Sequence, residues 1–380
     1  MKYFLIAGEA SGDLHGAALM RALKVSDPEA KFRFFGGEQM QAEGGTLLRH
    51  YREMAFMGFF EVVANLSKIS RNLRDCKHHL SIEKPDVVVL IDYPGFNFKI
   101  AKYAHEQGLK VFWYIAPKLW AWKAWRVKRL KAYTSKVYSI LPFEKEFFNK
   151  HGLDVEYIGN PLVDAVRSES ADILASEINF LSTDNGSPLV ALLPGSRVQE
   201  VRLILPEMLA TVRELEGIRV VISGATSVPE TEYRTQAKEI PVLFGNTYAL
   251  LSQSKAAIVA SGTATLETAL LKVPQLVVYR MKGSKLLTRL FRYFFLKVQY
   301  VSLPNLILNR EAVKEFIMHD MTAGNMRPEL EKLLHDNSHR ESLLRAYNEI
   351  EVKMGQGGAA ERAAAHMVNL LKNPSEEIKN

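Results

Sequence analysis

Asp92 is the side chain best placed for acid–base chemistry, because it directly follows Val87–Ile91, the most apolar run in the first half of the chain. A carboxylate at the end of a buried strand loses part of its hydration, which raises its pKa toward that of a working general base. A helix cap, or an ion pair with Lys99, would explain the same residue. Asp92 is therefore the first candidate for a catalytic base.

A glycine-rich loop follows another apolar run, Tyr3–Ala7. Its glycines have the spacing G-x3-G-x3-G, so the dinucleotide fingerprint G-x-G-x-x-G is missing. Glycine lets a backbone approach a ligand closely, and the start of the next helix offers free N–H groups. Capping of that helix by Ser11 or Asp13, and a helix-surface role for His15, are the alternatives. The candidate cleft residues are Gly8, Glu9, Ser11, Gly12, Asp13 and His15.

The turn Leu193–Arg197 (LPGSR) predicts one part of an anion site in the second half of the chain. Its glycine permits a tight turn, and Arg197 can reach a phosphate through charge-assisted hydrogen bonds. An ion pair with Glu200 is the alternative role of this arginine. The segment lacks the lysine of a Walker A sequence, which argues against a P-loop ATPase.

The segment 261–267 (SGTATLE) predicts the other part of the anion site, because it follows an apolar run and opens a helix. The N–H groups and the dipole of such a helix start suit a pyrophosphate. Glu267, about one turn inside, can accept bonds from a ribose diol, and a capping box with Thr263 is a compatible alternative. The candidate residues are Ser261, Gly262, Thr263, Ala264, Thr265 and Glu267.

Asn305 follows a proline in an otherwise apolar stretch, so its amide needs a partner from the backbone or from a ligand. No His, Cys or Asp cluster has the spacing of metal ligands, and no Gly-x-Ser-x-Gly elbow is present. The sequence therefore predicts neither a metal nor another cofactor. The single cysteine, Cys76, excludes an internal disulfide and fits a reducing compartment.

The elements that must position these residues are short apolar runs that alternate with segments of helical length. This alternation predicts βαβ units with parallel sheets, and continuous apolar runs predict strands covered on both faces. Ligands of such sheets bind beyond the carboxyl ends of the strands, and two facing sheets would leave a cleft. The predicted strands are Tyr3–Ala7, Arg33–Phe35, Val87–Ile91, Val111–Ile115, Val137–Ile140, Val155–Ile158, Val190–Leu193, Val220–Ser223, Val242–Phe244, Ala257–Ala260 and Leu276–Tyr279.

A polar stretch with Asp184, Asn185, Gly186, Ser187 and Pro188 divides the two series of strands. The sequence therefore predicts an α/β protein with two Rossmann-like domains. The expected boundaries are 1–166 for the first domain, 167–188 for a linker, 189–350 for the second domain and 351–380 for a helical tail that crosses back to the first domain.

The net charge of +7 is unevenly distributed along a chain of ordinary globular composition, which excludes disordered, collagenous and coiled-coil classes. The windows Gln107–Phe143 and Thr268–Arg310 each hold 8 basic and no acidic residues. The remaining chain carries −9, because its 33 basic residues face 42 acidic ones. Solvated faces or an anionic partner would explain such windows.

Three aromatic segments are candidates for a lipid surface, although no segment is apolar enough to cross a membrane. Lys285–Tyr300 interleaves phenylalanines with basic residues, as an interfacial helix does. An apolar stripe within Met54–Ile69 fits either the core or a membrane surface. Trp120, Trp122 and Trp125 lie among basic residues, which suits lipid headgroups, an acceptor phosphate or single-stranded nucleic acid.

Eight segments in the same order give the chain its resemblance to the lipid-A-disaccharide synthases, bacterial glycosyltransferases of the GT-B fold. The segments are GEASGDLHGA (8–17), LIDYPGFN (90–97), PKLWAWKAWRVKRL (117–130), LPFEKEFF (141–148), LLPGSRVQEV (192–201), ASGTATLE (260–267), VVYRMK (277–282) and YVSLPNLI (300–307).

The resemblance implies an inverting transfer of 2,3-diacylglucosamine from its UDP derivative to 2,3-diacylglucosamine 1-phosphate (lipid X), giving a β-1,6 disaccharide 1-phosphate and UDP. It implies that Asp92 is the catalytic aspartate, that Arg197 contacts UDP and that Asn305 is the motif asparagine. Many relatives have an aspartate where this chain has Gly95, so this chain lacks that second carboxylate. The family acts in the cytoplasm, peripherally on the inner face of the inner membrane. The expected partners are the two glycolipids and an anionic membrane surface, without nucleic acid, and a homodimer is compatible with the sequence.

Two other functions fit parts of the same sequence. One is another UDP-sugar enzyme of the same architecture, such as a 2-epimerase or a transferase acting on undecaprenyl lipid. The other is a non-enzymatic protein that binds lipid or nucleic acid. The first alternative does not require the aromatic and basic patches, and the second does not require Arg197 and the 261–267 helix start to serve one reaction with Asp92.

Overall fold

The computed structural model describes residues 1–54, 65–175, 186–281 and 299–373. Most of the apolar stripe of Met54–Ile69 and most of the Lys285–Tyr300 segment lie outside these residues, as does the side chain of Trp122. Within the described part, none of the helices has both the length and the apolar character that a membrane span requires.

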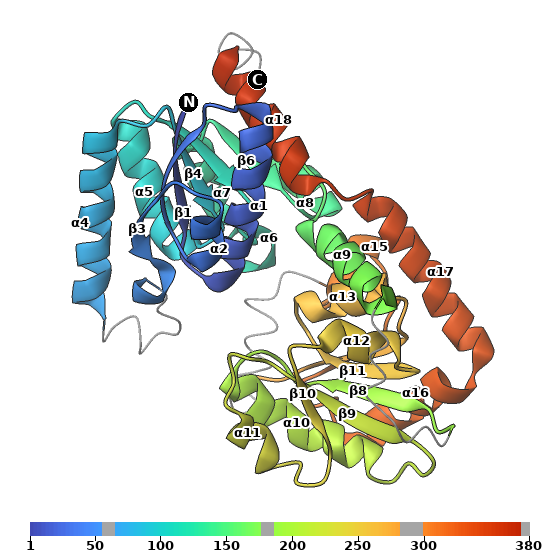
Figure 1. Cartoon of the computed structure of the whole chain (residues 1–380). Coiled ribbons are helices and arrows are strands. Elements are labelled where there is room, and N and C mark those ends of the chain that lie inside the picture. The colour runs from blue at the N-terminus through green and yellow to red at the C-terminus, as the bar shows by residue number, and fades with distance from the viewer. Residues whose placement is uncertain (55–64, 176–185, 282–298, 374–380) are drawn as a thin grey trace. The chain divides into compact units, whose positions relative to one another are not determined.

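The chain divides into two compact units, of which the first contains Met1–Pro161 together with Gly357–Asn380. Its seven-stranded parallel sheet has the order β3-β2-β1-β4-β5-β6-β7 (Figure 1). The strands are β1 (Lys2–Ala7), β2 (Lys31–Gly36), β3 (Thr46–His50), β4 (Val87–Ile91), β5 (Lys110–Tyr114), β6 (Lys136–Ser139) and β7 (Glu156–Tyr157). The helices are α1 (Ala10–Ser26), α2 (Glu38–Ala42), α4 (Leu66–Glu83), α5 (Pro94–Glu106), α6 (Leu119–Trp122), α7 (Val127–Tyr133), α8 (Pro142–Lys150) and α18 (Ala359–Lys372), with 3-10 turns at Tyr51–Glu53 (η1) and Ala124–Arg126 (η2).

The second unit contains Leu162–Gln356 and is built on a six-stranded parallel sheet of order β10-β9-β8-β11-β12-β13. Its strands are β8 (Leu189–Leu193), β9 (Arg219–Gly224), β10 (Val242–Phe244), β11 (Ala256–Ala260), β12 (Gln275–Tyr279) and β13 (Glu315–Ile317). Its helices are α9 (Pro161–Ala175), which begins at the unit boundary, α10 (Val198–Val212), α11 (Glu230–Arg234), α12 (Thr247–Ser252), α13 (Thr263–Leu270), α15 (Leu303–Leu308), α16 (Ala323–His335) and α17 (Asn337–Met354).

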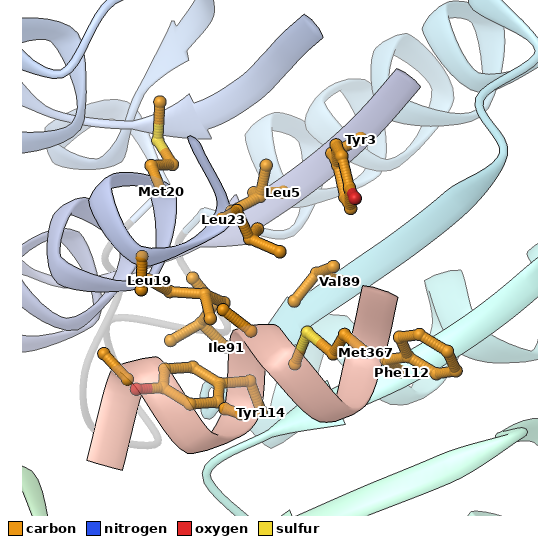
Figure 2. Close-up of a cluster of buried hydrophobic side chains, with 14 of the residues drawn as sticks. Tyr3, Leu5, Leu19, Met20, Leu23, Val89, Ile91, Phe112, Tyr114 and Met367 are labelled. Carbon is orange, nitrogen blue, oxygen red and sulfur yellow. The ribbon is translucent and has the colours of Figure 1, made fainter. Parts of the chain in front are cut away.

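Alternation along β1 shows why the first sheet is covered on both faces. Tyr3 and Leu5 point into a core shared with α1 and α18, whereas Phe4 and Ile6 point into a core shared with α4, α5 and α7. All four side chains are buried, so the strand is apolar throughout instead of alternating with polar residues. Figure 2 shows the first of these cores, with Leu19 of α1, Ile91 of β4 and Met367 of α18 among its labelled members.

Helix α18 completes the first core from the far end of the chain. Ala363, Ala364 and Met367 of this helix are buried, and the helix lies along α1. Arg362 also fastens it to the segment after β7, because its Nε donates to the carbonyl oxygen of Ile158 at 2.9 Å. Gly159 leaves room for this side chain, since a Cβ there would come within 2.2 Å of the guanidinium. The first unit therefore depends on residues more than 200 positions apart.

The structure differs from the expected domain boundaries and strands in two respects. Residues 167–175, expected in a linker, belong to helix α9, and the division between units falls at Pro161 and Leu162. Strands β3 and β13 were not predicted. Both are sheet edges on which Phe316 alone is buried, so they lack the continuous apolar run that marks the central strands.

Candidate active site

Asp92 lies in a strained turn at the carboxyl end of β4. Asp92 and Tyr93 both have left-handed backbone conformations, with φ of 42° and 46°, which cost of order 1 kcal/mol or more each for non-glycine residues. Asn97 holds the turn, because its buried Nδ2 donates to the carbonyl oxygens of Asp92 at 2.8 Å and Ile91 at 3.3 Å. The Asp92 N–H donates to the carbonyl oxygen of Tyr114 at 3.1 Å. Contacts with β5 and α5 thus fix the backbone position from which the Asp92 side chain extends.

Burial raises the pKa of Asp92 above its ordinary value, while the charge of Lys118 and the N–H of Tyr93 act in the opposite direction. The basic partner is therefore Lys118, which follows β5, and not the Lys99 that the sequence suggested. A desolvated carboxylate with a raised pKa is a stronger base than an exposed one. These surroundings suit the role predicted for Asp92.

The glycine-rich loop meets the Asp92 turn through Gly8. A Cβ at Gly8 would lie 2.2 Å from the ring of Tyr93, so only glycine allows this approach. Glu9 is the N-cap residue of α1 and Ser11 is exposed, and no side chain caps this helix. Gly12 packs on β1, where an added Cβ would meet that of Ala7 at 3.2 Å.

Asp13 does not cap its own helix, which was the alternative to a place in the cleft, and it caps another helix instead. It is buried, and its carboxylate caps α2 by accepting from the N–H groups of Gly37 at 2.6 Å, Gln39 at 3.0 Å and Met40 at 3.1 Å. His15 is half-buried, and burial lowers its pKa to about 4. Its imidazole is therefore neutral at physiological pH.

A second carboxylate, Glu144, lies buried after β6 and was missed at the sequence level. Its Oε2 accepts from the N–H groups of Leu141 at 3.1 Å and Ile140 at 3.2 Å, and its Oε1 accepts from Trp120 Nε1 at 3.1 Å. Burial raises its pKa to about 7, against the effect of these donors and of Lys118. The only available signal was the proline-initiated helix with glutamate at its third position, which is typical of a capping box.

The second unit holds a polar cavity of about 330 Å³ at the carboxyl ends of β8, β9 and β11. Arg197 lines it with a side chain that is 66% exposed, and its Nη1 lies 3.6 Å from Glu200 Oε1. Such an exposed pair is weak, so the guanidinium can turn to a phosphate at low cost. Gly195 has φ of 112°, and a Cβ there would lie 2.5 Å from Glu200 Oε2.

Helix α13 presents its first turn to the same cavity. Gly262 is its N-cap and provides no side-chain cap, so the capping box suggested for Thr263 and Glu267 does not form. Five of the six residues predicted from this segment line the cavity: Ser261, Gly262, Thr263, Ala264 and Glu267. The sixth, Thr265, is buried, and its Oγ1 donates to the carbonyl oxygen of Gly262 at 2.8 Å. It therefore stabilises the first turn of α13 without lining the cavity.

Three cavity residues escaped the sequence analysis: Ser223, Ala225 and Thr247. Ser223 is the penultimate residue of β9, and its Oγ lies 2.7 Å from Oγ1 of Thr247 at the start of α12. The strand-end rule applied to β9 would have found Ser223 and Ala225, and applied to β10 it would have found Thr247. A smaller cavity of about 290 Å³ shares Arg197, Glu200 and Ser261 with the first and adds the apolar side chains of Leu203 and Ile204.

Asn305 lines neither of these two cavities, and its expected place among the donor-binding residues stays a prediction. It is buried, its Oδ1 accepts from the N–H groups of Ala312 and Val313, and its Nδ2 donates to the Val313 carbonyl and to Glu315, all within 2.7–2.9 Å. The same Glu315 accepts from the N–H groups of Val301 and Ser302. Asn305 therefore locks α15 to β13.

The Val301 segment in turn supports the cavity, because its carbonyl oxygen accepts from Ser261 Oγ at 2.8 Å. Asn305 can thus affect the cavity only through the backbone it holds. Among the described residues, no group of three or more His, Cys, Asp or Glu side chains is placed to hold a metal ion.

Comparison with known proteins places this arrangement in a family. The model of the lipid-A-disaccharide synthetase family matches residues 3–367, which include both strand-end sites. The chain belongs to this family. It is 35% identical over 378 residues to the lipid-A-disaccharide synthase of Myxococcus xanthus (strain DK1622), covering 97% of each chain. It is 34% identical to that of Koribacter versatilis (strain Ellin345), covering 98% of this chain and 99% of the relative.

Solved structures with the same fold are far more distant in sequence. UDP-GlcNAc 2-epimerase from Neisseria meningitidis, bound to UDP-GlcNAc, has a TM-score of 0.68 at 14% identity, with 97% of this chain and all of that chain covered. The calicheamicin glycosyltransferase CalG4 has a TM-score of 0.59 at 14% identity, with 97% of each chain covered. These likenesses confirm the predicted GT-B fold of two parallel-sheet α/β domains and carry no further argument.

Proposed function

We propose that this family member, a lipid-A-disaccharide synthase, transfers 2,3-diacylglucosamine from its UDP derivative to the 6-hydroxyl of 2,3-diacylglucosamine 1-phosphate. The observation that carries the proposal is the cavity at β8 and β11, where an exposed arginine meets a helix start without a side-chain cap. Charge-assisted bonds and helix N–H groups are the ordinary means of holding a diphosphate. The epimerase alternative shares only the fold with this chain.

In the proposed reaction Asp92 accepts the proton of the acceptor hydroxyl as the oxygen attacks the anomeric carbon of the donor. The new C–O bond forms while the bond from that carbon to the UDP oxygen breaks, so the configuration inverts. UDP leaves with the electron pair, and Arg197 and the N–H groups of α13 stabilise its charge. Glu267 lines the same cavity and is placed to hold the ribose diol.

The acyl chains of both substrates extend the proposal to location and partners. An enzyme with these substrates would take them from a bilayer, so we place it peripherally at the cytoplasmic face of the inner membrane. Leu203 and Ile204, in the smaller cavity beside Arg197, provide apolar surface for part of the donor. We also propose that the protein can form a homodimer and that no nucleic acid takes part in the reaction.

The deciding experiment measures UDP release from the UDP-linked diacylglucosamine with and without the acceptor 1-phosphate. We expect release only when both are present, together with a disaccharide product. Release that ignores the acceptor would contradict the transfer, and conversion of UDP-GlcNAc alone would favour a 2-epimerase. Tight RNA binding without release of UDP would favour a non-enzymatic role.

A further inference from the structure

A cluster of cations and aromatic rings in the first unit has no role in the proposed chemistry so far. Trp125 in η2 is 57% exposed, and two guanidinium groups lie over its ring. The Cζ atoms of Arg126 and Arg129 are 5.3 Å and 5.2 Å from the ring centroid. We call Trp125, Arg126 and Arg129 the arginine clamp, since two positive groups share one flat apolar surface.

No carboxylate neutralises the clamp within the described part of the chain. Neither Arg126 nor Arg129 has an ion pair there, and the buried Nε of Arg126 has no hydrogen-bond partner. Burial and the nearby Arg129 lower the pKa of Arg126, and burial and Arg126 lower that of Lys123. Like charges held together at the cost of mutual repulsion are stabilised by an anion, and guanidinium forks match phosphate oxygens.

The clamp belongs to the same end of the first sheet as Asp92. Arg126 lies 5.7 Å from the ring centroid of Phe98, which is in the second turn of α5, the helix that begins directly after the Asp92 turn. Lys118, at the start of the same segment, acts electrostatically on Asp92. A sugar 1-phosphate carries its 6-hydroxyl and its phosphate on one ring, so an acceptor whose hydroxyl is at Asp92 needs its phosphate bound nearby in this unit.

We infer that the arginine clamp is the binding site for the 1-phosphate of the acceptor, an inference that rests on the proposed function. Arg126 and Arg129 bind the phosphomonoester dianion and Trp125 packs against the sugar. The phosphate of a bilayer lipid offers similar chemistry, but a monoester carries more charge than a diester and fits two guanidinium groups better. The clamp then distinguishes the phosphorylated acceptor from an unphosphorylated sugar.

The test compares equilibrium binding of a short-chain diacylglucosamine 1-phosphate, soluble without vesicles, with that of the same sugar lacking phosphate. Arg126→Gln and Arg129→Gln should each weaken binding of the phosphorylated sugar by about 10- to 100-fold, the usual worth of a charged hydrogen bond. Binding of the unphosphorylated sugar should change little. Arg345→Gln, which removes one exposed charge paired with Glu341, is the matched control and should change neither affinity.

Each other outcome would overturn the inference. Equal losses for both sugars, with a lowered melting temperature, would make the clamp structural. Unchanged sugar binding with weaker binding to phosphatidylglycerol vesicles than in the wild type would assign the clamp to bilayer phosphate. Failure of the proposed function is a separate result: the wild type would bind the phosphorylated sugar through the clamp but release no UDP from the donor.

Discussion

The carboxyl ends of the two sheets differ in backbone conformation and in the exposure of their candidate side chains. At the first sheet, three non-glycine residues have left-handed conformations, namely Asp92, Tyr93 and Ile115, the last with φ of 67°. At the second sheet the positive φ of the cavity turn belongs to a glycine, Gly195, and the candidate arginine Arg197 is exposed; the left-handed Met318, with φ of 59°, follows the edge strand β13 and lines neither cavity. Strain and burial hold one group in place at the first site, whereas open space and main-chain N–H groups at the second suit the large anion that we propose for it.

Because of this difference, we expect substitutions at the two sites to change different measured quantities. The first contains Asp92, the proposed base, so substitutions there should change the rate and its pH dependence. The second contains redundant weak donors, so single substitutions should change UDP affinity by smaller factors.

Asp92→Asn should give the largest effect, and it is the most direct test of the difference between the two sites. Loss of a general base typically lowers turnover about 10²–10⁴-fold. Turnover is measured by UDP release and UDP affinity by calorimetry, and the affinity should stay near wild type because Asp92 is absent from the cavity lining. Asp154→Asn, which removes an exposed partner of Lys136, is the control. Near-normal turnover of Asp92→Asn would remove it from the mechanism.

Arg197→Gln should weaken UDP binding by about 10- to 100-fold through loss of charge-assisted bonds. The control is Arg202→Gln in α10, the helix that begins directly after Arg197; the guanidinium of Arg202 is paired with Glu232. Calorimetric titration of UDP against both variants gives the comparison. If the two variants bound UDP equally well, the cavity would not be the nucleotide site.

Asn305→Ala should lower the free energy of unfolding by about 1–3 kcal/mol, because it leaves buried N–H and carbonyl groups unpaired. Chemical denaturation measures this loss. UDP affinity of the folded fraction should change by less than that of Arg197→Gln, since Asn305 reaches the cavity only through Val301 and Ser261. A stable variant that fails to bind UDP would restore the asparagine as a ligand.

Lys118→Gln should give the smallest effect, a displacement of the acidic limb of kcat/KM to higher pH. A base must be ionised, so activity falls as pH falls through the pKa of Asp92, which burial already raises. Removing the positive charge that opposes this effect raises the pKa further, and the limb moves with it. His15, with a pKa of about 4, contributes no limb near neutrality. A limb that did not move would show that Lys118 is screened from Asp92.

The sequence was sufficient wherever one strand or one loop determined the outcome. The apolar runs predicted the central strands, and the strand-end rule correctly predicted that Asp92 follows β4 and that Arg197 and Glu267 lie at strand ends of the second sheet; their roles stay predictions. It was insufficient where a distant backbone supplied the partner. A polar residue such as Asp13 or Asn305 shows that a hydrogen-bond partner is required, but whether that partner is α2, β13 or a ligand is decided by tertiary structure.

The position of α18 near the end of the sequence determines which unit can complete its folding first during synthesis. During synthesis the residues of the second unit, Leu162–Gln356, leave the ribosome before the helix that completes the first core. The second unit can therefore reach its final contacts while the first sheet still exposes the apolar face that Ala363 and Met367 later cover. The core of the first unit therefore stays incomplete, with this apolar surface exposed to solvent, until α18 has been synthesised.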